Sequence, residues 1–183
     1  MEAALPPHLG GHANKTHVDA GALSSLRKWG VRTLLDLGCG PGGQVSLSNS
    51  LGILAEGIDG DPSCLPSHLH DFTTGPYRGK PGTIFRFDAI WCVEFLEHVE
   101  ERYLPNVMET IVGADPVIVV VSAAPPGKSG HHHVNCQTES YWRRRFNDAG
   151  LAFSGSRTEE IRRASTMERE FIRERGMVFI RRR

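Results

Sequence analysis

A glycine-rich stretch holds the residues best suited to binding a ligand. Residues 34–43 read Leu-Leu-Asp-Leu-Gly-Cys-Gly-Pro-Gly-Gly, after an apolar run that begins at Val31. Glycines adopt positive φ at little cost, and without a Cβ they let the backbone approach a ligand closely. The amides of such a turn, with the N-terminus of the helix expected at 44–50, favour a polar or anionic group. We therefore expect a nucleoside-cofactor site at the carboxyl end of the strand at 31–37.

The acid expected to bind a ribose lies about 20 residues further along the chain. Asp59 follows the apolar run 53–58, and a carboxylate at the end of a strand can accept hydrogen bonds from both ribose hydroxyls. Asp61 is the rival, although Gly60-Asp61-Pro62 already reads as a turn. The glycine spacing also satisfies the G-x-G-x-x-G pattern of dinucleotide sites, which leaves an NAD-dependent oxidoreductase as an alternative.

The segment Asp36-Leu37-Gly38-Cys39-Gly40-Pro41-Gly42 resembles motif I of the class I S-adenosylmethionine (SAM)-dependent methyltransferases. The resemblance continues, in the order typical of the family, through the segments 57–59, 70–72, 87–90 and 96–99. It implies an α/β, Rossmann-like, doubly wound sheet of seven strands, mainly parallel, with an antiparallel last strand and helices on both faces. A single domain is expected over 14–183, preceded by a flexible arm at 1–13.

The same resemblance implies which residues bind SAM. Asp71 would accept a hydrogen bond from the adenine amino group, Phe72 would pack on the ring, and Glu94 would lie by the sulfonium and the methionine ammonium. Asp36 distinguishes the motif from a pyrophosphate site, since an acid there would press on a phosphate. The predicted cofactor residues are Asp36, Gly38, Gly40, Gly42, Asp59, Gly60, Asp71, Phe72, Val93 and Glu94.

The acceptor side of the site is expected after the apolar run 117–121. The run His131-His132-His133-Val134-Asn135 is followed by Tyr141-Trp142, and residues after the fifth strand border the methyl group in this fold. A histidine is the natural general base near neutral pH. We therefore expect His131 and His133 to be catalytic and His132, Asn135, Tyr141 and Trp142 to bind substrate. His98 is read as a packing and capping residue.

A metal site at the histidine run was considered and set aside. The three histidines and Cys136 suggest metal binding, but along the chain no acid or C-x-x-C pair completes a tetrahedral site. We therefore expect no metal.

The elements that must position these groups follow from apolar runs and turn residues. Helices are expected at 18–29, 44–50, 94–112, 141–150 and 159–173. Strands are expected at 31–37, 53–58, 65–70, 87–93, 117–121, 151–155 and 177–181.

The whole chain sets wider limits. Of 183 residues, 39% are hydrophobic and 23% charged, which is ordinary for one globular domain. The four cysteines are scattered, no signal pattern is evident, and the longest apolar run is too short to span a bilayer. We therefore expect a cytoplasmic protein that does not contact a membrane.

The residues after the fourth strand bear on the substrate. Trp91-Cys92-Val93-Glu94 stands where DNA amino-methylating enzymes of this class carry [DN]-P-P-[YF], and the chain contains no Pro-Cys dipeptide. With only four lysines, no specific nucleic-acid substrate is expected. The prediction is a SAM-dependent methyltransferase that modifies an oxygen or nitrogen of a small or medium-sized acceptor. A SAM-binding protein that does not methylate is the alternative.

Overall fold

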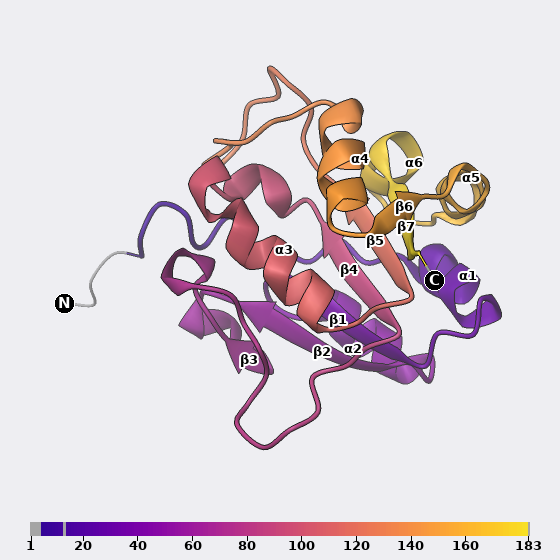
Figure 1. Cartoon of the computed structure of the whole chain (residues 1–183), viewed down its shortest axis with the longest axis horizontal. Helices are drawn as coiled ribbons and strands as arrows, with labels where there is room; N and C mark the ends of the chain where they lie inside the picture. Colours follow the sequence, from indigo (N-terminus) through magenta and orange to yellow (C-terminus); the bar gives the residue numbers. More distant parts are fainter. Residues whose placement is uncertain (1–4, 13, 183) are drawn as a thin grey trace.

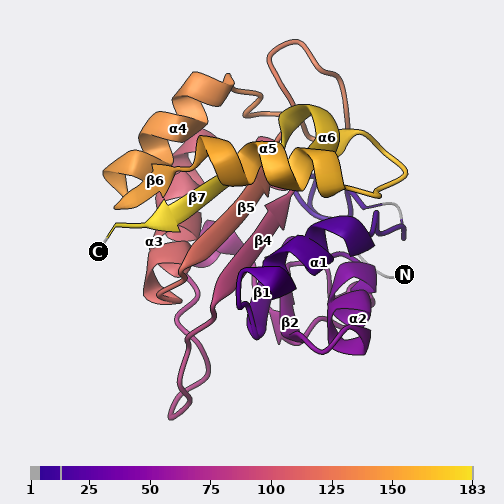
Figure 2. The same ribbon diagram turned by 90° about the vertical axis from the view of Figure 1, so that its right-hand side faces the viewer.

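The computed structural model describes residues 5–12 and 14–182, which form a seven-stranded sheet with helices on both faces (Figures 1 and 2). The strand order is β3-β2-β1-β4-β5-β7-β6. The strands are β1 Thr33–Leu37, β2 Leu54–Asp59, β3 His68–Leu69, β4 Ala89–Val93, β5 Ile118–Ser122, β6 Leu151–Phe153 and β7 Met177–Arg181. The α-helices are α1 Ala20–Lys28, α2 Gly43–Ser50, α3 Leu104–Gly113, α4 Glu139–Asp148, α5 Gly155–Ala164 and α6 Phe171–Arg175.

The pairing of the strands confirms the predicted topology. β1 lies between β2 and β4 in parallel, β5 continues the parallel sheet beside β4, and β7 runs antiparallel between β5 and β6. All residues of β5 are buried, as expected of a strand that is covered on both faces. The carboxyl ends of β1, β2 and β4 therefore meet at one edge of the sheet.

The strands bury alternate side chains in two hydrophobic layers. Val119 and Val121 of β5 pack in the layer covered by α3 and α4, whereas Ile118 and Val120 pack in the layer covered by α1, α5 and α6. Figure 2 shows the two sets of helices on opposite sides of the sheet. Because successive side chains of a strand point to opposite faces of the sheet, the continuous apolar run of β5 contributes to both layers.

The helix predicted for 94–112 is wrong in its first half. After β4 the chain makes two 3-10 turns, η3 Leu96–His98 and η4 Glu101–Tyr103, and α3 begins only at Leu104. Pro105 stands in the first turn of α3, where its missing N–H costs nothing, and it cannot continue a helix that began earlier. Leu96–His98 therefore belongs to the loop at the edge of the sheet.

The single helix predicted for 159–173 is also wrong, because the chain forms α5 and α6 with a break at Ser165. The buried carboxylate of Asp19 accepts a hydrogen bond from the hydroxyl of Ser165 and one from the backbone N–H of Thr166 at 2.9 Å. The same carboxylate caps α1 by accepting from the N–H of Ala22 at 2.9 Å. One carboxylate thus ties the start of α1 to the α5–α6 link.

Within residues 5–12 and 14–182, every helix is too short or too polar to cross a lipid bilayer.

Candidate active site

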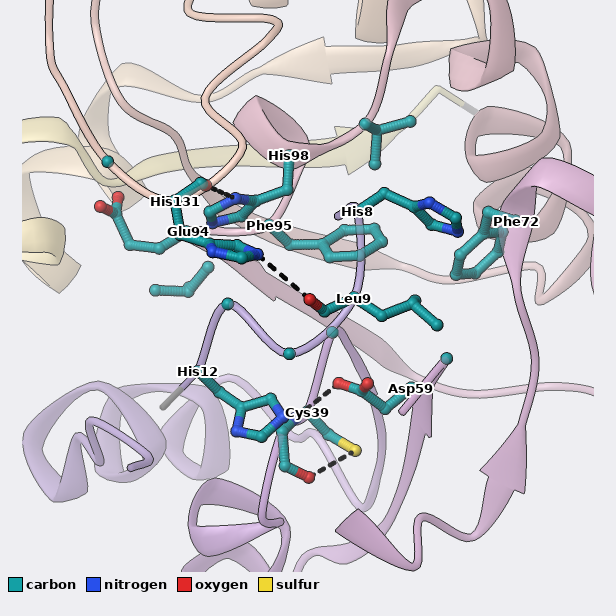
Figure 3. Close-up of a pocket in the computed structure, with 18 of the residues that line it drawn as sticks. His8, Leu9, His12, Cys39, Asp59, Phe72, Glu94, Phe95, His98 and His131 are labelled. Atoms are coloured by element: carbon teal, nitrogen blue, oxygen red, sulfur yellow. Dashed lines mark hydrogen bonds between the residues drawn. The ribbon is translucent and has the colours of Figure 1, made fainter. Parts of the chain in front are cut away.

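A cavity of about 370 Å³ opens at the carboxyl ends of β1, β2 and β4 (Figure 3). Every predicted cofactor residue except Gly42 lines it. Gly42 instead caps α2 with φ +78°, so it shapes the turn without facing the cavity. The lining residues from the prediction are Asp36, Gly38, Gly40, Asp59, Gly60, Asp71, Phe72, Val93 and Glu94.

The backbone conformation of the glycine turn, residues 38–43 after β1, leaves its backbone accessible from the cavity. Gly38 and Gly40 have φ of +72° and +50°, a region that side chains disfavour. A Cβ at Gly38 would lie 2.8 Å from Cγ of Phe95, so space as well as conformation requires glycine there. The carboxylate of Asp59 accepts hydrogen bonds from the N–H of Gly40 at 2.8 Å and of Asp61 at 2.9 Å. Asp59 therefore links the end of β2 to the glycine turn.

Asp36 lies beneath this turn and is only 4% exposed. Burial, and second to it the charge of Asp59, raise the pKa of the Asp36 carboxyl well above its ordinary value. A cationic group beside these two acids would offset that repulsion. The base of the cavity therefore favours a positively charged ligand.

Glu94 brings a third carboxylate to the cavity at the end of β4 (Figure 3). Its φ of +53° lies in the left-handed region, which is uncommon for a residue with a side chain and is often found at functional sites. Oε1 accepts a hydrogen bond from the hydroxyl of Ser122 at 2.7 Å, and Oε2 lies 3.3 Å from the guanidinium of Arg175. These contacts fix the direction of the Glu94 side chain.

The N-terminal arm crosses the cavity. His8 Nε2 lies 2.9 Å from Asp71, and His12 Nε2 lies 3.1 Å from Asp61. The side chain of Leu9 packs on Gly60, where an added Cβ would meet Leu9 Cδ2 at 2.5 Å. The flexible arm predicted for 1–13 falls partly on residues 1–4 and 13, which lie outside the described residues. Residues 8–12 form one wall of the cavity, a role that the lack of periodicity in their sequence did not indicate.

The arm contacts lower the pKa of the acids that they reach. Burial alone would raise the pKa of the Asp71 carboxyl, but hydrogen bonds from His8 and Thr73 outweigh it and hold the pKa below its ordinary value. The pKa of Asp61 is lowered in the same way, since hydrogen bonds from Ser63 and His12 overcome the effect of burial. Both acids are therefore ionised partners of the arm at neutral pH.

Two of the three adjacent histidines reach the cavity. His131 lines it and donates from Nε2 to the carbonyl of Leu9 at 3.1 Å, and His133 lines it beside His98. His132, with φ +44°, does not line the cavity. Burial is the main cause that lowers the pKa of His132.

His98 is a cavity residue that the sequence analysis read as packing. Its Nδ1 donates to the carbonyl of His131 at 2.8 Å. This bond joins the η3 turn to the loop between β5 and α4, residues 123–138, which is called the histidine loop below. Burial lowers its pKa to about 4, so the imidazole is neutral at pH 7. The break of the predicted helix at 94–103 is what brings His98 to this edge.

Like His132, the other three residues predicted to bind substrate lie outside the cavity. Trp142 is 1% exposed and belongs to the core beside Phe146, because residues four apart share one face of α4. The hydroxyl of Tyr141 donates to Glu101 at 2.9 Å outside the cavity. Asn135 is 2% exposed and does not line the cavity, and its backbone N–H donates to the carbonyl of Glu97 at 3.0 Å.

No family model and no curated protein matches the chain. Solved structures do. The sugar N-methyltransferase KedS8 from Streptoalloteichus is 14% identical, with a TM-score of 0.63 over 90% of this chain and 88% of that chain. A Burkholderia thailandensis 1,6-didemethyltoxoflavin-N1-methyltransferase, with bound 1,6-didemethyltoxoflavin and S-adenosylhomocysteine, is 12% identical, with a TM-score of 0.59 over 89% of this chain and 77% of that chain.

The small RNA methyltransferase HEN1 is 19% identical, with a TM-score of 0.60 over 100% of this chain and 26% of that chain. At these identities the likeness shows the fold. The chain has the class I SAM-dependent methyltransferase fold, and this prediction is confirmed.

Proposed function

We propose that the chain is a SAM-dependent methyltransferase that acts on an oxygen or nitrogen of a small or medium-sized acceptor. The observation that carries the proposal is the convergence of three carboxylates, Asp36, Asp59 and Glu94, with the glycine turn around one cavity. These groups come from the ends of three neighbouring strands. A nicotinamide dinucleotide would instead bring a pyrophosphate to the turn, and its negative charge would oppose ionisation of the buried Asp36 further.

The donor set of the cavity fits SAM. Asp59 would hold the ribose, since each of its oxygens accepts one backbone N–H and keeps capacity for a further bond. Asp36 and Glu94 would face the cationic methionine end. A positive charge there would favour the ionised form of Asp36, whose pKa is raised by burial and, second to it, by the charge of Asp59. Asp71 and Phe72 would hold the adenine, which requires Leu9 and His8 of the arm to move from Gly60 and Asp71 or to pack on the ring.

The cofactor supplies a methyl group on a positively charged sulfur, ready for displacement by a nucleophile. The protein then has to hold the acceptor in line with that methyl and to exclude water. The arm and the histidine loop close the cavity from two sides through the hydrogen bond between His131 and the carbonyl of Leu9. An acceptor that loses its proton during attack would transfer it to His131, which lines the cavity.

The test is a screen with a labelled methyl donor. Small-molecule and RNA fractions of a cell lysate are incubated separately with the protein, and labelled product and S-adenosylhomocysteine are measured. The proposal expects product in the small-molecule fraction, and none with Gly40→Val, whose branched side chain disfavours the φ of +50°. Labelling of RNA alone would move the acceptor to nucleic acid. Cofactor binding with no product in any fraction would favour a protein that binds SAM without methylating.

A further inference from the structure

The side chains of Glu97, His98 and His133 lie close together at the edge of the cavity, and each of them can bind a metal ion. One ligand-capable atom from each lies within 4.8 Å of the other two. Glu97 and His98 belong to the η3 turn after β4, whereas His133 comes from the loop after β5. From the sequence alone no acid could be assigned to a site with the histidine run, because Glu97 stands 36 residues away from His133 along the chain and only the fold brings it there.

Both imidazoles are oriented as metal ligands usually are. His98 Nδ1 donates to the carbonyl of His131 at 2.8 Å, and His133 Nδ1 donates to the carbonyl of Lys128 at 2.9 Å. A carbonyl oxygen carries no hydrogen, so the proton of each neutral ring lies on Nδ1 and Nε2 presents its lone pair. Within the described residues neither Nε2 has a hydrogen-bond partner. A backbone carbonyl that fixes the tautomer in this way is a common support of metal-binding histidines.

Gly130 leaves room for the second imidazole. A Cβ at Gly130 would lie 2.6 Å from Cδ2 of His133, and closer still to Nε2 and Cε1. Because this Cβ position lies at similar distances from three ring atoms, it is above the flat face of the imidazole and not in the plane of the ring. The Nε2 lone pair, which lies in that plane, is therefore not blocked by Gly130.

Glu97 supplies the observation that points to a missing ligand. Its side chain is fully buried, and Oε1 accepts a hydrogen bond from the N–H of Ala124 at 3.0 Å. Oε2 is buried without any partner among residues 5–12 and 14–182. A buried carboxylate oxygen is normally paired or bound to a metal. The backbone carbonyl of Glu97 also accepts from Val134 and Asn135 at 3.0 Å, which fixes the η3 turn against the histidine loop.

We propose that Glu97, His98 and His133 form a binding site for a divalent transition-metal ion of the zinc class. Two imidazoles and one carboxylate suit Zn²⁺ and its neighbours, whereas Mg²⁺ and Ca²⁺ prefer oxygen ligands alone. Because His98 and His133 line the cavity, the open positions of the ion face the space in which the acceptor would lie. There an ion would bind an oxygen of the acceptor and lower its pKa. That consequence rests on the proposed function, but binding of the metal does not.

A second cluster, His12, Asp61 and Cys64, has similar ligand types but lacks a free group. Asp61 accepts from the N–H of Ser63 and lies 3.1 Å from His12, and Cys64 Sγ lies 3.0 Å from His12 Nε2. A metal there would have to replace contacts that already satisfy the side chains. This cluster therefore serves as the control for the first.

The test is a titration of the full chain, freed of metal with a chelator, with Co²⁺ followed by visible absorption and with Zn²⁺ followed by calorimetry. The proposal expects a single ion per chain, with the visible bands of a nitrogen- and oxygen-ligated Co²⁺ and no sulfur charge-transfer band. Glu97→Gln and His133→Ala should each weaken binding by more than about 100-fold, above the loss typical of supporting residues. The double variant His12→Asn/Cys64→Ser should bind as the unaltered chain does.

His133→Ala removes a loop side chain and leaves the core intact, so it keeps the test valid if Glu97→Gln fails to fold. Absence of Co²⁺ and Zn²⁺ binding to the folded, unaltered chain would overturn the proposal. So would binding that survives His133→Ala, or binding that is lost in the His12→Asn/Cys64→Ser variant. Because the readout is binding of the metal, failure of the methylation screen would leave this result unaffected.

Discussion

Replacing Asp59 probes both the cofactor and the glycine turn. Its carboxylate accepts from the N–H groups of Gly40 and Asp61 at 2.8 and 2.9 Å, and in the proposed complex it also accepts from the ribose. The charge-assisted pair of hydrogen bonds to a ribose is worth about 2–3 kcal/mol, so Asp59→Ala should raise the Kd for S-adenosylhomocysteine about 30- to 150-fold.

The two backbone contacts add a separate effect on stability. Their loss should lower the free energy of unfolding by about 1–3 kcal/mol, because each net hydrogen bond contributes about 0.5–1.5 kcal/mol. Asp59→Asn keeps one acceptor oxygen and should lose less of both quantities. Isothermal titration calorimetry gives the affinity, and urea denaturation gives the stability of the same samples.

Asp61→Asn is the matched control, since Asp61 is bonded to Ser63 and His12 instead of the turn. Its affinity for S-adenosylhomocysteine should stay within a few-fold of that of the unaltered chain. Unchanged affinity in a folded Asp59→Ala variant would refute the role of Asp59. A large loss in Asp61→Asn alone would transfer the role to the rival acid.

Three further predictions concern the glycine turn, the N-terminal arm and the histidines of the site. Gly38→Ala should lower the free energy of unfolding more than Gly42→Ala: both pay about 1–2 kcal/mol for positive φ, but only at Gly38 does the new Cβ meet Phe95. Equal losses in urea denaturation would argue against that contact. Hydrogen bonds from the arm lower the pKa of Asp61 and of Asp71. The ionised acids therefore stabilise the closed arm at neutral pH, and this stabilisation is lost as the pH falls through the lowered pKa values. Protection of the amides of residues 8–12 against hydrogen exchange, taken relative to the intrinsic exchange rate at each pH, should decrease in acid, and protection that is independent of pH would contradict the pairing with the acids. His131→Ala should reduce methyl transfer by about 10²–10⁴-fold if His131 takes the proton, with affinity for S-adenosylhomocysteine nearly intact, whereas His132→Ala should retain turnover. Equal turnover of the two variants would exclude His131 as the base.

Local patterns were sufficient to predict most of the parallel sheet. A strand with an acid next to its last residue, followed by glycines that need positive φ, defines β1 and its turn within about ten residues. The continuous apolar run of β5 likewise requires burial on both faces. These features depend on residues close in sequence, so they are visible before the chain folds.

Contacts between distant residues account for what the sequence did not reveal. Asp19 breaks the predicted C-terminal helix through a hydrogen bond to Ser165, 146 positions away. The arm reaches Asp71 through His8, and Glu97 meets His133, although no spacing rule joins either pair. The position of Trp142 was within reach of sequence reasoning, because its spacing from Phe146 marks the buried face of α4.

Whether this cavity binds SAM can be decided by a calorimetric titration with S-adenosylhomocysteine beside one with NAD⁺. One S-adenosylhomocysteine should bind per chain, NAD⁺ should give no binding heat, and Gly40→Val should abolish the signal. Binding of NAD⁺ with no heat from S-adenosylhomocysteine, in a folded and unaltered chain, would contradict binding of SAM by this cavity.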